Sequence, residues 1–314
     1  NSMYDFANST KNYTFTFADR YFKFKNYTIQ ASKPSFVDIM FSVTDQNNKG
    51  VDYLTNTDFT VLEDNAPTSP SETFRYVRKM KQIPSKIKTV LLLDNSTSVS
   101  ADIEAIKNAA VKFVQTIREG QEIAIYVFSD TPVLLQNFAT NKNLLETAIK
   151  SIGSGYPSTN LYGSVITGLS IWDDAYTLSS ITQGSLIVFT DGSDSQGSST
   201  LSSVISSRGD KKIYVIGLGS EINPSALNQI ANPGPYFPIQ KAGELESVFA
   251  AIQSDIVQFS NSFYWLNYMS PKRTGTHTLK VSAANNTNTT STSYLTGSFS
   301  AAGFQSVKSG VYAN

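Results

Sequence analysis

From Lys88 to Ser100 the chain reads Lys-Thr-Val-Leu-Leu-Leu-Asp-Asn-Ser-Thr-Ser-Val-Ser. An apolar, partly β-branched run leads into an Asp, and hydroxyl residues two positions apart follow it. After Ser100 the apolar residues recur at spacings of three and four, which is typical of a helix with one buried face. They are Ile103, Ile106, Ala110, Phe113 and Ile117. The stretch therefore predicts a buried strand, a polar turn and an amphipathic helix.

The polar turn of this stretch carries three side chains suited to a metal ion. In a doubly wound α/β sheet, such a turn lies at the carboxyl edge of the strands, where ligands bind. Asp94, Ser96 and Ser98 offer one carboxylate and two hydroxyls. All three are hard oxygen donors, which Mg²⁺ and Ca²⁺ require.

Two later segments carry the same kind of side chain. A glycine-rich loop from Gly153 to Gly163 contains Thr159, and a short apolar strand from Leu186 to Phe189 runs into Thr190-Asp191-Gly192. Taken one at a time, Asp94 could simply cap the following helix and Asp191 could stabilise a turn. We expect the Ser193-Asp194-Ser195 segment to be a solvated loop, with contact to a partner as the alternative.

In this order, the Asp-x-Ser-x-Ser turn, the Thr on a glycine-rich loop and the strand-ending Asp resemble a known constellation. It is the metal-ion-dependent adhesion site (MIDAS) of von Willebrand factor A (VWA) domains. The resemblance implies that Ser96, Ser98 and Thr159 are hydroxyl ligands, and that Asp94 and Asp191 act directly or through water. It also implies Mg²⁺ as the ion, with Mn²⁺ or Ca²⁺ possible, and a carboxylate from a partner completing the coordination.

Strands and helices alternate between about residues 85 and 260, which predicts an α/β, Rossmann-like VWA domain with a mainly parallel sheet. The gap before Val133–Phe138 is too short for a crossover helix, so this strand should be an antiparallel edge. The other expected strands are Gln121–Phe128, Leu186–Phe189, Ile213–Ile216 and Tyr236–Ile239. The expected helices after the first are 141–152, 160–172, 198–208, 224–230 and 244–259.

Both ends of the chain show β patterns instead. Val37, Ile39, Phe41 and Val43 alternate with Asp38, Met40 and Ser42, as in a half-buried strand, and Phe74–Val77 is a further short strand. The expected C-terminal strands are Phe263–Tyr268, Thr276–Val281 and Tyr294–Phe299. We expect residues 1–84 and 261–314 to form one immunoglobulin-like β-sandwich into which a VWA domain at 85–260 is inserted. This layout resembles bacterial VWA surface proteins.

Composition narrows the possible partners and compartments. The 314 residues carry 25 basic and 25 acidic side chains, with no basic block, so nucleic acid is not an expected partner. No apolar run approaches the roughly 20 residues of a transmembrane helix. The absence of cysteine excludes disulfides and thiol chemistry, and it is compatible with an exported bacterial protein.

Catalysis is not expected. The single histidine, His277, lies in a C-terminal strand far in sequence from Asp94, which argues against a Ser-His-Asp hydrolase. The glycine-rich loop lacks the Lys-Ser/Thr of a phosphate-binding loop. No general base accompanies the metal ligands.

The sequence thus predicts a divalent-metal-dependent adhesion protein that recognises a protein or another carboxylate-bearing ligand. An envelope-complex assembly factor that uses the same site is the first alternative, and a metal-dependent hydrolase is the second. The expected location is the cell surface or the extracellular space, with the periplasm as the alternative.

Overall fold

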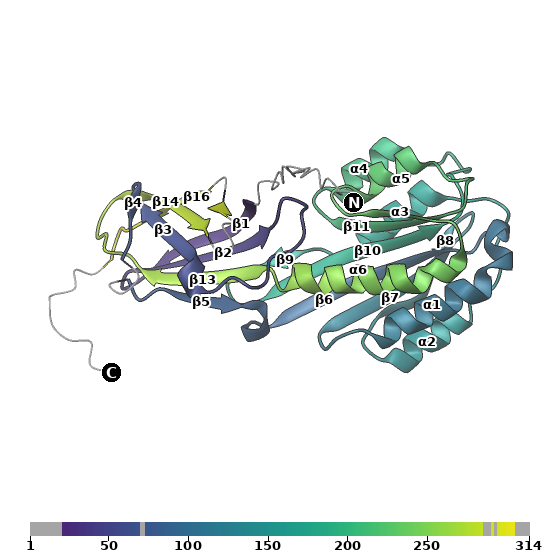
Figure 1. Cartoon of the computed structure of the whole chain (residues 1–314), viewed down its shortest axis with the longest axis horizontal. Coiled ribbons are helices and arrows are strands. Elements are labelled where there is room, and N and C mark those ends of the chain that lie inside the picture. The colour runs from purple at the N-terminus through teal and green to yellow at the C-terminus, as the bar shows by residue number, and fades with distance from the viewer. Residues whose placement is uncertain (1–20, 70–72, 285–289, 292–293, 305–314) are drawn as a thin grey trace, which may run out of the picture.

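The computed structural model describes residues 21–69, 73–284, 290–291 and 294–304. These residues form two parts that lie end to end along the long axis of the molecule (Figure 1). One part is a helix-covered sheet built from the middle of the sequence. The other part consists of two β-sheets whose strands come from both ends of the sequence, and we call them the flanking sheets.

The α/β part is centred on a seven-stranded sheet in the described residues, ordered β12-β11-β10-β6-β7-β8, with β9 paired to β10. Its strands are β6 (Ser85–Asp94), β7 (Gln121–Phe128), β8 (Pro132–Ala139), β9 (Ala175–Tyr176), β10 (Ile181–Thr190), β11 (Lys212–Leu218) and β12 (Tyr236–Ile239). All pairs from β12 to β7 are parallel. The edge strand β8 is antiparallel to β7, which confirms that prediction.

Helices cover both faces of this sheet. They are α1 (Ile103–Gln115), α2 (Lys142–Lys150), α3 (Leu161–Ser170), α4 (Leu201–Arg208), α5 (Pro224–Ala231) and α6 (Leu245–Ser260). Buried residues of α1, α2 and α6 share one apolar cluster with the sheet, and those of α3, α4 and α5 share a second cluster on the other face. The chain leaves β6 toward β7 and later returns to β10 on the other side. The carboxyl end of β6 is therefore the topological switch point, where ligands bind in such sheets.

The flanking sheets are ordered β15-β1-β2-β13-β5 and β16-β14-β3-β4 within the described residues. Their strands are β1 (Tyr21–Ser32), β2 (Phe36–Thr44), β3 (Phe59–Glu63), β4 (Ala66–Pro67), β5 (Tyr76–Lys79), β13 (Phe263–Met269), β14 (Thr276–Ala283), β15 (Thr290–Ser291) and β16 (Leu295–Ser300). Strand β13 pairs with both β2 and β5, so the two ends of the sequence meet in one sheet.

The two flanking sheets face one another across a shared apolar core. Phe41 and Tyr264 of the first sheet are fully buried, as are Val281 and Leu279 of the second, and all four belong to one cluster. The flanking strands are therefore present as predicted. An immunoglobulin-like topology stays a prediction.

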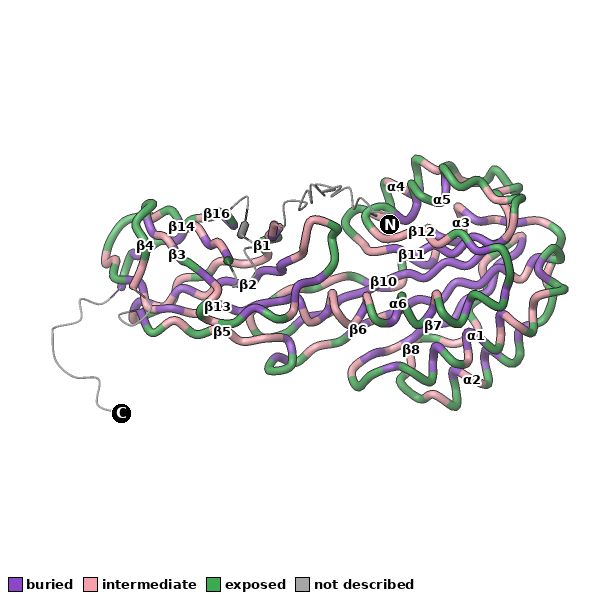
Figure 2. The backbone as a smooth tube through the Cα atoms, viewed as in Figure 1, coloured by how far each residue is buried: buried purple, intermediate pink, exposed green. Residues whose placement is uncertain are grey.

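The half-buried pattern predicted for β2 is wrong for one of its faces. Met40 and Ser42 were expected to face solvent, yet they are 0% and 3% exposed. Met40 and Trp265, which are paired across β2 and β13, belong to the same apolar cluster as the core of the α/β part. Figure 2 shows buried chain running from β2 and β13 toward β10. This face of the flanking sheet is buried because it packs against the neighbouring part.

The strand predicted at Phe74–Val77 starts two residues later, at Tyr76. Phe74 has a φ of 45°, in the left-handed region that a bulky residue rarely adopts, so it cannot belong to a strand.

A testable pH effect arises in the flanking sheets. His277 Nδ1 lies 2.7 Å from Asp64 Oδ2, and Nε2 lies 2.7 Å from the Thr274 carbonyl. The bond to Asp64 raises the pKa of His277, so its contribution to stability is present below about pH 6.5 and is lost as pH rises through the folded-state pKa. We expect His277→Gln to lower Tm by about 1–2 °C at pH 5.5 and by less at pH 9. An equal loss at both pH values in thermal unfolding would contradict this.

Candidate metal centre

Asp94 ends β6 and is fully buried, although it is a carboxylate. Its Oδ1 accepts hydrogen bonds from Ser96 N at 2.9 Å and Ser96 Oγ at 2.6 Å. Its Oδ2 accepts a bond of 2.7 Å from Thr190 Oγ1. Both carboxylate oxygens are therefore oriented by neighbours, one in the turn that follows β6 and one at the end of the adjacent strand β10.

The hydroxyls continue this network to the second Asp. Ser96 Oγ lies 3.0 Å from Ser98 Oγ, and Ser98 Oγ donates to Asp191 Oδ1 at 2.8 Å. Asp191 directly follows β10, which runs beside β6 with Phe189 opposite Leu93. The parallel register thus brings the two strand ends, and their two carboxylates, to the same edge.

Thr159, on the glycine-rich loop, lies close to Gly192, the residue after Asp191. It is 6% exposed, and a Cβ built on Gly192 would lie 3.5 Å from Thr159 Oγ1. The structure therefore gathers all five predicted residues at the carboxyl edge of the sheet. Asp94, Ser96, Ser98 and Asp191 are joined by hydrogen bonds. The hydroxyl of the fifth residue, Thr159, lies close to Gly192, the residue after Asp191.

The loops that carry these residues are bonded to one another. Thr97 N donates to the Tyr156 carbonyl at 3.1 Å, and Gly155 N donates to the Asn95 carbonyl at 2.6 Å. On the other side, Thr159 N donates to Ser195 Oγ at 2.8 Å. These bonds hold the glycine-rich loop between the Asp94 turn and the loop after β10.

The electrostatics of this network favour a bound cation. Burial raises the pKa of Asp94 to about 6, and burial also raises the pKa of Asp191, with further contributions from Glu221 and Asp102. None of the ion pairs among the described residues involves Asp94 or Asp191, so these two partly dehydrated carboxylates have no cationic partner there. A divalent ion would supply a compensating positive charge.

The donor set fits a hard cation. No group of three or more His, Cys, Asp or Glu residues placed to hold a metal occurs in the described part of the chain, so a site here depends on hydroxyl oxygens. The three hydroxyls and two carboxylates are all oxygen donors, which suits Mg²⁺, Mn²⁺ or Ca²⁺.

Comparison with known proteins identifies the fold. The von Willebrand factor type A domain family matches residues 89–251, just over half of the chain. The chain belongs to the VWA family. No curated protein sequence matches it.

Three solved structures show the range of similarity. A VWA protein from Catenulispora acidiphila is 13% identical, with a TM-score of 0.50, 90% of this chain and 72% of that chain covered. The ArnB paralog VWA2 from Sulfolobus acidocaldarius is 19% identical, with a TM-score of 0.47 and coverages of 90% and 75%. Proximal thread matrix protein 1 from the mussel byssus, solved with a zinc-occupied MIDAS motif, is 17% identical, with a TM-score of 0.48 and coverages of 63% and 50%.

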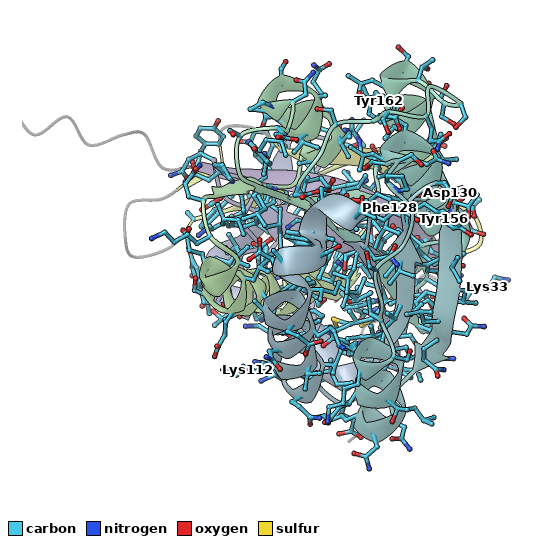
Figure 3. All side chains as sticks on the ribbon, turned by 90° about the vertical axis from the view of Figure 1, so that its right-hand side faces the viewer. Lys33, Lys112, Phe128, Asp130, Tyr156 and Tyr162 are labelled. Atoms are coloured by element: carbon cyan, nitrogen blue, oxygen red, sulfur yellow. The ribbon has the colours of Figure 1, made fainter. Side chains whose placement is uncertain are left out.

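The centre lies at the end of the VWA domain that faces away from the flanking sheets. Figure 3 looks onto this end, where Tyr156 and Asp130 lie near one another. The Tyr156 side chain is 64% exposed and stands on the loop just before Thr159, so it is available to a partner. Trp172, in contrast, is buried in the core of the VWA domain.

Two residues that position the VWA site were not predicted from the sequence. Thr190 orients Asp94 from the neighbouring strand, and its place before a strand-ending Asp is the only sequence signal for this role. The segment at 193–195 was expected to be a solvated loop. Instead, Asp194 Oδ1 accepts from Tyr162 N at 3.0 Å, and Ser195 exchanges hydrogen bonds with the backbone of Thr159.

Ser195→Ala tests whether this loop contact supports the VWA site. The change leaves the buried Thr159 N–H without its acceptor, which costs about 1 kcal/mol. We expect Tm to fall by about 2–4 °C and Mg²⁺ affinity to fall several-fold, measured by thermal unfolding over a Mg²⁺ titration. Ser193→Ala is the matched control, since the Ser193 hydroxyl donates to the Glu221 carbonyl and has no bond to Thr159 among the described residues. Equal Mg²⁺ affinity in both variants would show that the Ser195 bond does not position Thr159.

Proposed function

We propose that this VWA protein binds a carboxylate-bearing partner, most simply a protein, through a divalent cation. Ser96, Ser98 and Thr159 would supply hydroxyl oxygens, and Asp94 and Asp191 would act directly or through water. The observation that carries the proposal is the convergence of these five side chains, from three separate loops, at one edge of the sheet.

Mg²⁺ is the ion that we propose, with Mn²⁺ or Ca²⁺ as alternatives. Two carboxylates balance the charge of the ion, while neutral hydroxyls leave it able to attract a further anionic ligand. Mg²⁺ keeps exchangeable waters when the protein cage is incomplete. A partner's Asp or Glu can replace one of these waters, which would make recognition both metal-dependent and specific for a carboxylate.

Binding rather than catalysis is the role that we propose. His277, the single histidine, lies in β14 of the flanking sheets, where both ring nitrogens are engaged by Asp64 and Thr274. It cannot serve as a general base beside Asp94, which lies at the far end of the VWA domain.

We also propose an organisation and a location. A VWA domain at residues 85–260 is inserted into a sandwich formed by 1–84 and 261–314, of which 1–20 and 305–314 lie outside the described residues. The protein is exported, and it presents the metal centre at the cell surface with the flanking sheets as a mount. None of the helices in the described residues has the length and apolar character to cross a membrane.

Thermal unfolding in EDTA and in 10 mM Mg²⁺, Mn²⁺ or Ca²⁺ tests the metal site directly. An ion at tenfold its dissociation constant adds about 1.4 kcal/mol of stability, or a rise of a few degrees in Tm. Carboxylate recognition is then tested by titrating the Mg²⁺-loaded protein with acetate and with a short Asp-containing peptide, using the amide peptide as control. No Tm shift with any of the three ions would contradict the proposal.

A further inference from the structure

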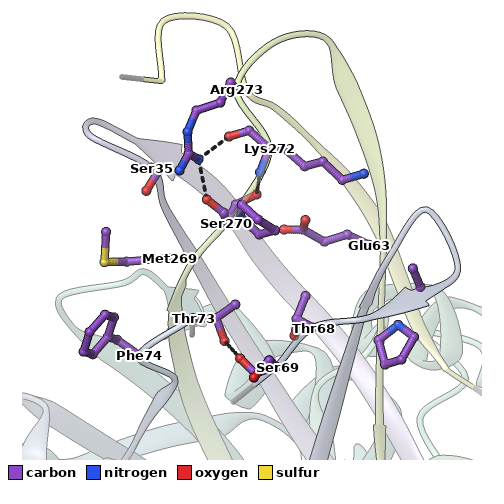
Figure 4. A pocket seen from close by; sticks show the side chains of 13 residues that line it. Ser35, Glu63, Thr68, Ser69, Thr73, Phe74, Met269, Ser270, Lys272 and Arg273 are labelled. Carbon is purple, nitrogen blue, oxygen red and sulfur yellow. Dashed lines mark hydrogen bonds between the residues drawn. The ribbon is translucent and has the colours of Figure 1, made fainter. Parts of the chain in front are cut away.

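A second pocket lies in the flanking sheets, at the opposite end of the molecule from the metal centre. Its volume is about 470 Å³, which is ample for a small ligand. Figure 4 shows it from close by. The residues used in the argument below are Ser35, Glu63, Phe74, Ser270, Lys272 and Arg273.

Two buried polar atoms in the wall of this pocket have no hydrogen-bond partner among the described residues. Glu63 is 2% exposed, and its Oε1 accepts a hydrogen bond of 2.8 Å from the Tyr268 hydroxyl. Its Oε2 has no hydrogen-bond partner among the described residues, and neither does Ser35 Oγ, whose residue is fully buried. Buried polar atoms in native proteins are nearly always paired, so these two atoms have a hydrogen-bonding capacity that no described residue uses.

The charges around the pocket favour a ligand that is neutral overall. Lys272 is paired with Asp64 at 2.8 Å, which leaves Glu63 and Arg273 as the opposite charges of the lining. Arg273 NH1 donates to the carbonyls of Ser270 and Lys272, and no described carboxylate forms an ion pair with it. A cationic ligand would face Arg273, while an anionic ligand would face Glu63.

Phe74 adds an aromatic surface at the edge of the pocket. Its ring is 67% exposed, although its backbone is held at a φ of 45°. Such strain in a bulky residue is rare and collects at functional sites. The strain brings no burial of the ring within this chain, which is consistent with a ring kept available for a ligand.

We propose that this pocket binds a saccharide. A sugar hydroxyl both donates and accepts, so neighbouring hydroxyls on one ring can donate to Glu63 Oε2 and accept from Arg273. The apolar C–H face of a pyranose can pack against the exposed ring of Phe74. An ammonium group could satisfy Glu63 alone, but it would face Arg273, which no described carboxylate neutralises. The proposal is independent of the metal centre.

The test is saturation-transfer NMR of the full 314-residue chain with methyl α-mannoside, methyl β-galactoside and N,N′-diacetylchitobiose. We expect transfer to at least one sugar, with affinity falling tenfold or more in Phe74→Ala and in Glu63→Gln. Phe74→Ala changes an exposed side chain, so its fold should be intact, and near-wild-type Tm and circular dichroism verify this for both variants. Tyr156→Ala, an exposed aromatic at the metal end, is the matched control and should bind as wild type does.

The same experiment in EDTA separates this site from the metal centre, since sugar binding should be unchanged. No transfer from wild type to any sugar at 10 mM would overturn the proposal, as would transfer that survives both pocket variants. Binding of glycine or a lysine-containing peptide in place of sugars, with the same loss in Glu63→Gln, would also overturn it, in favour of an ammonium ligand.

Discussion

Asp94→Asn should make the metal-free protein more stable at pH 7.5 and at the same time abolish its response to Mg²⁺. Burial raises the pKa of Asp94 from 3.8 to about 6. Such a carboxyl has a higher pKa in the folded state than in the unfolded state, so its ionisation destabilises the native state. This cost grows as pH rises from the unfolded-state pKa to the folded-state pKa, and it is constant at higher pH. Each pKa unit corresponds to about 1.4 kcal/mol, so the cost at pH 7.5 is about 3 kcal/mol.

The amide can be accommodated by the groups that contact Asp94. Its oxygen can accept from Ser96, and its Nδ2 can donate to Thr190 Oγ1. The Thr190 hydroxyl, which then no longer donates to residue 94, has the Gly192 carbonyl at 3.2 Å as an alternative acceptor. Weaker hydrogen bonds to a neutral acceptor offset roughly 1 kcal/mol. The expected net gain is therefore about 2 kcal/mol in EDTA.

Urea unfolding at pH 7.5, in EDTA and in 10 mM Mg²⁺, measures both effects. Wild type should gain stability with Mg²⁺, and Asp94→Asn should not. Asp130→Asn, at the same edge of the sheet, should leave the Mg²⁺ response unchanged. If Asp94→Asn lowers stability in EDTA and retains the Mg²⁺ gain, then Asp94 is a structural cap and not part of a metal site.

The convergence of the five candidate residues could be predicted from the sequence because their signals are local. Asp94 and Asp191 each follow an apolar strand, and parallel strands end at one edge, so their proximity follows from the fold class. Thr190 and Ser195 were missed for a different reason. Their roles depend on which atoms face one another across neighbouring strands and loops, and Ser and Thr are frequent enough in this chain that no single one stands out.

The flanking sheets show a second limit of sequence patterns. Alternation in β2 correctly indicated the face that covers the core between the flanking sheets, but it could not show that Met40 lies against a different part of the molecule. Burial of that face depends on a surface formed by residues far away in sequence. Phe74 is a similar case, because its left-handed backbone is set by the turn in which it lies and not by its own β propensity.

Trp265→Ala should destabilise the whole chain by about 3–5 kcal/mol, the usual cost of deleting a large buried aromatic side chain. Trp265 is 2% exposed on β13, its indole donates to the Thr177 carbonyl at 3.3 Å, and it belongs to the apolar cluster of the VWA core. The cavity would therefore open between the two parts. We expect Tm to fall by roughly 10 °C, with Tyr156→Ala as an exposed aromatic control that costs little.

The shape of the Trp265→Ala transition is as informative as its midpoint. Since Met40 and Trp265 share one core with the VWA domain, unfolding of wild type should be a single cooperative transition. α6 ends at Ser260 and β13 begins at Phe263, so the connection between the parts is also too short to let them separate freely. Weakening this contact should lower the midpoint of the single transition or begin to split it into two transitions. The Mg²⁺-induced rise in the Tm of the VWA domain should persist. Two separate transitions already in wild type, with only one of them moved by Trp265→Ala, would show that the parts fold independently.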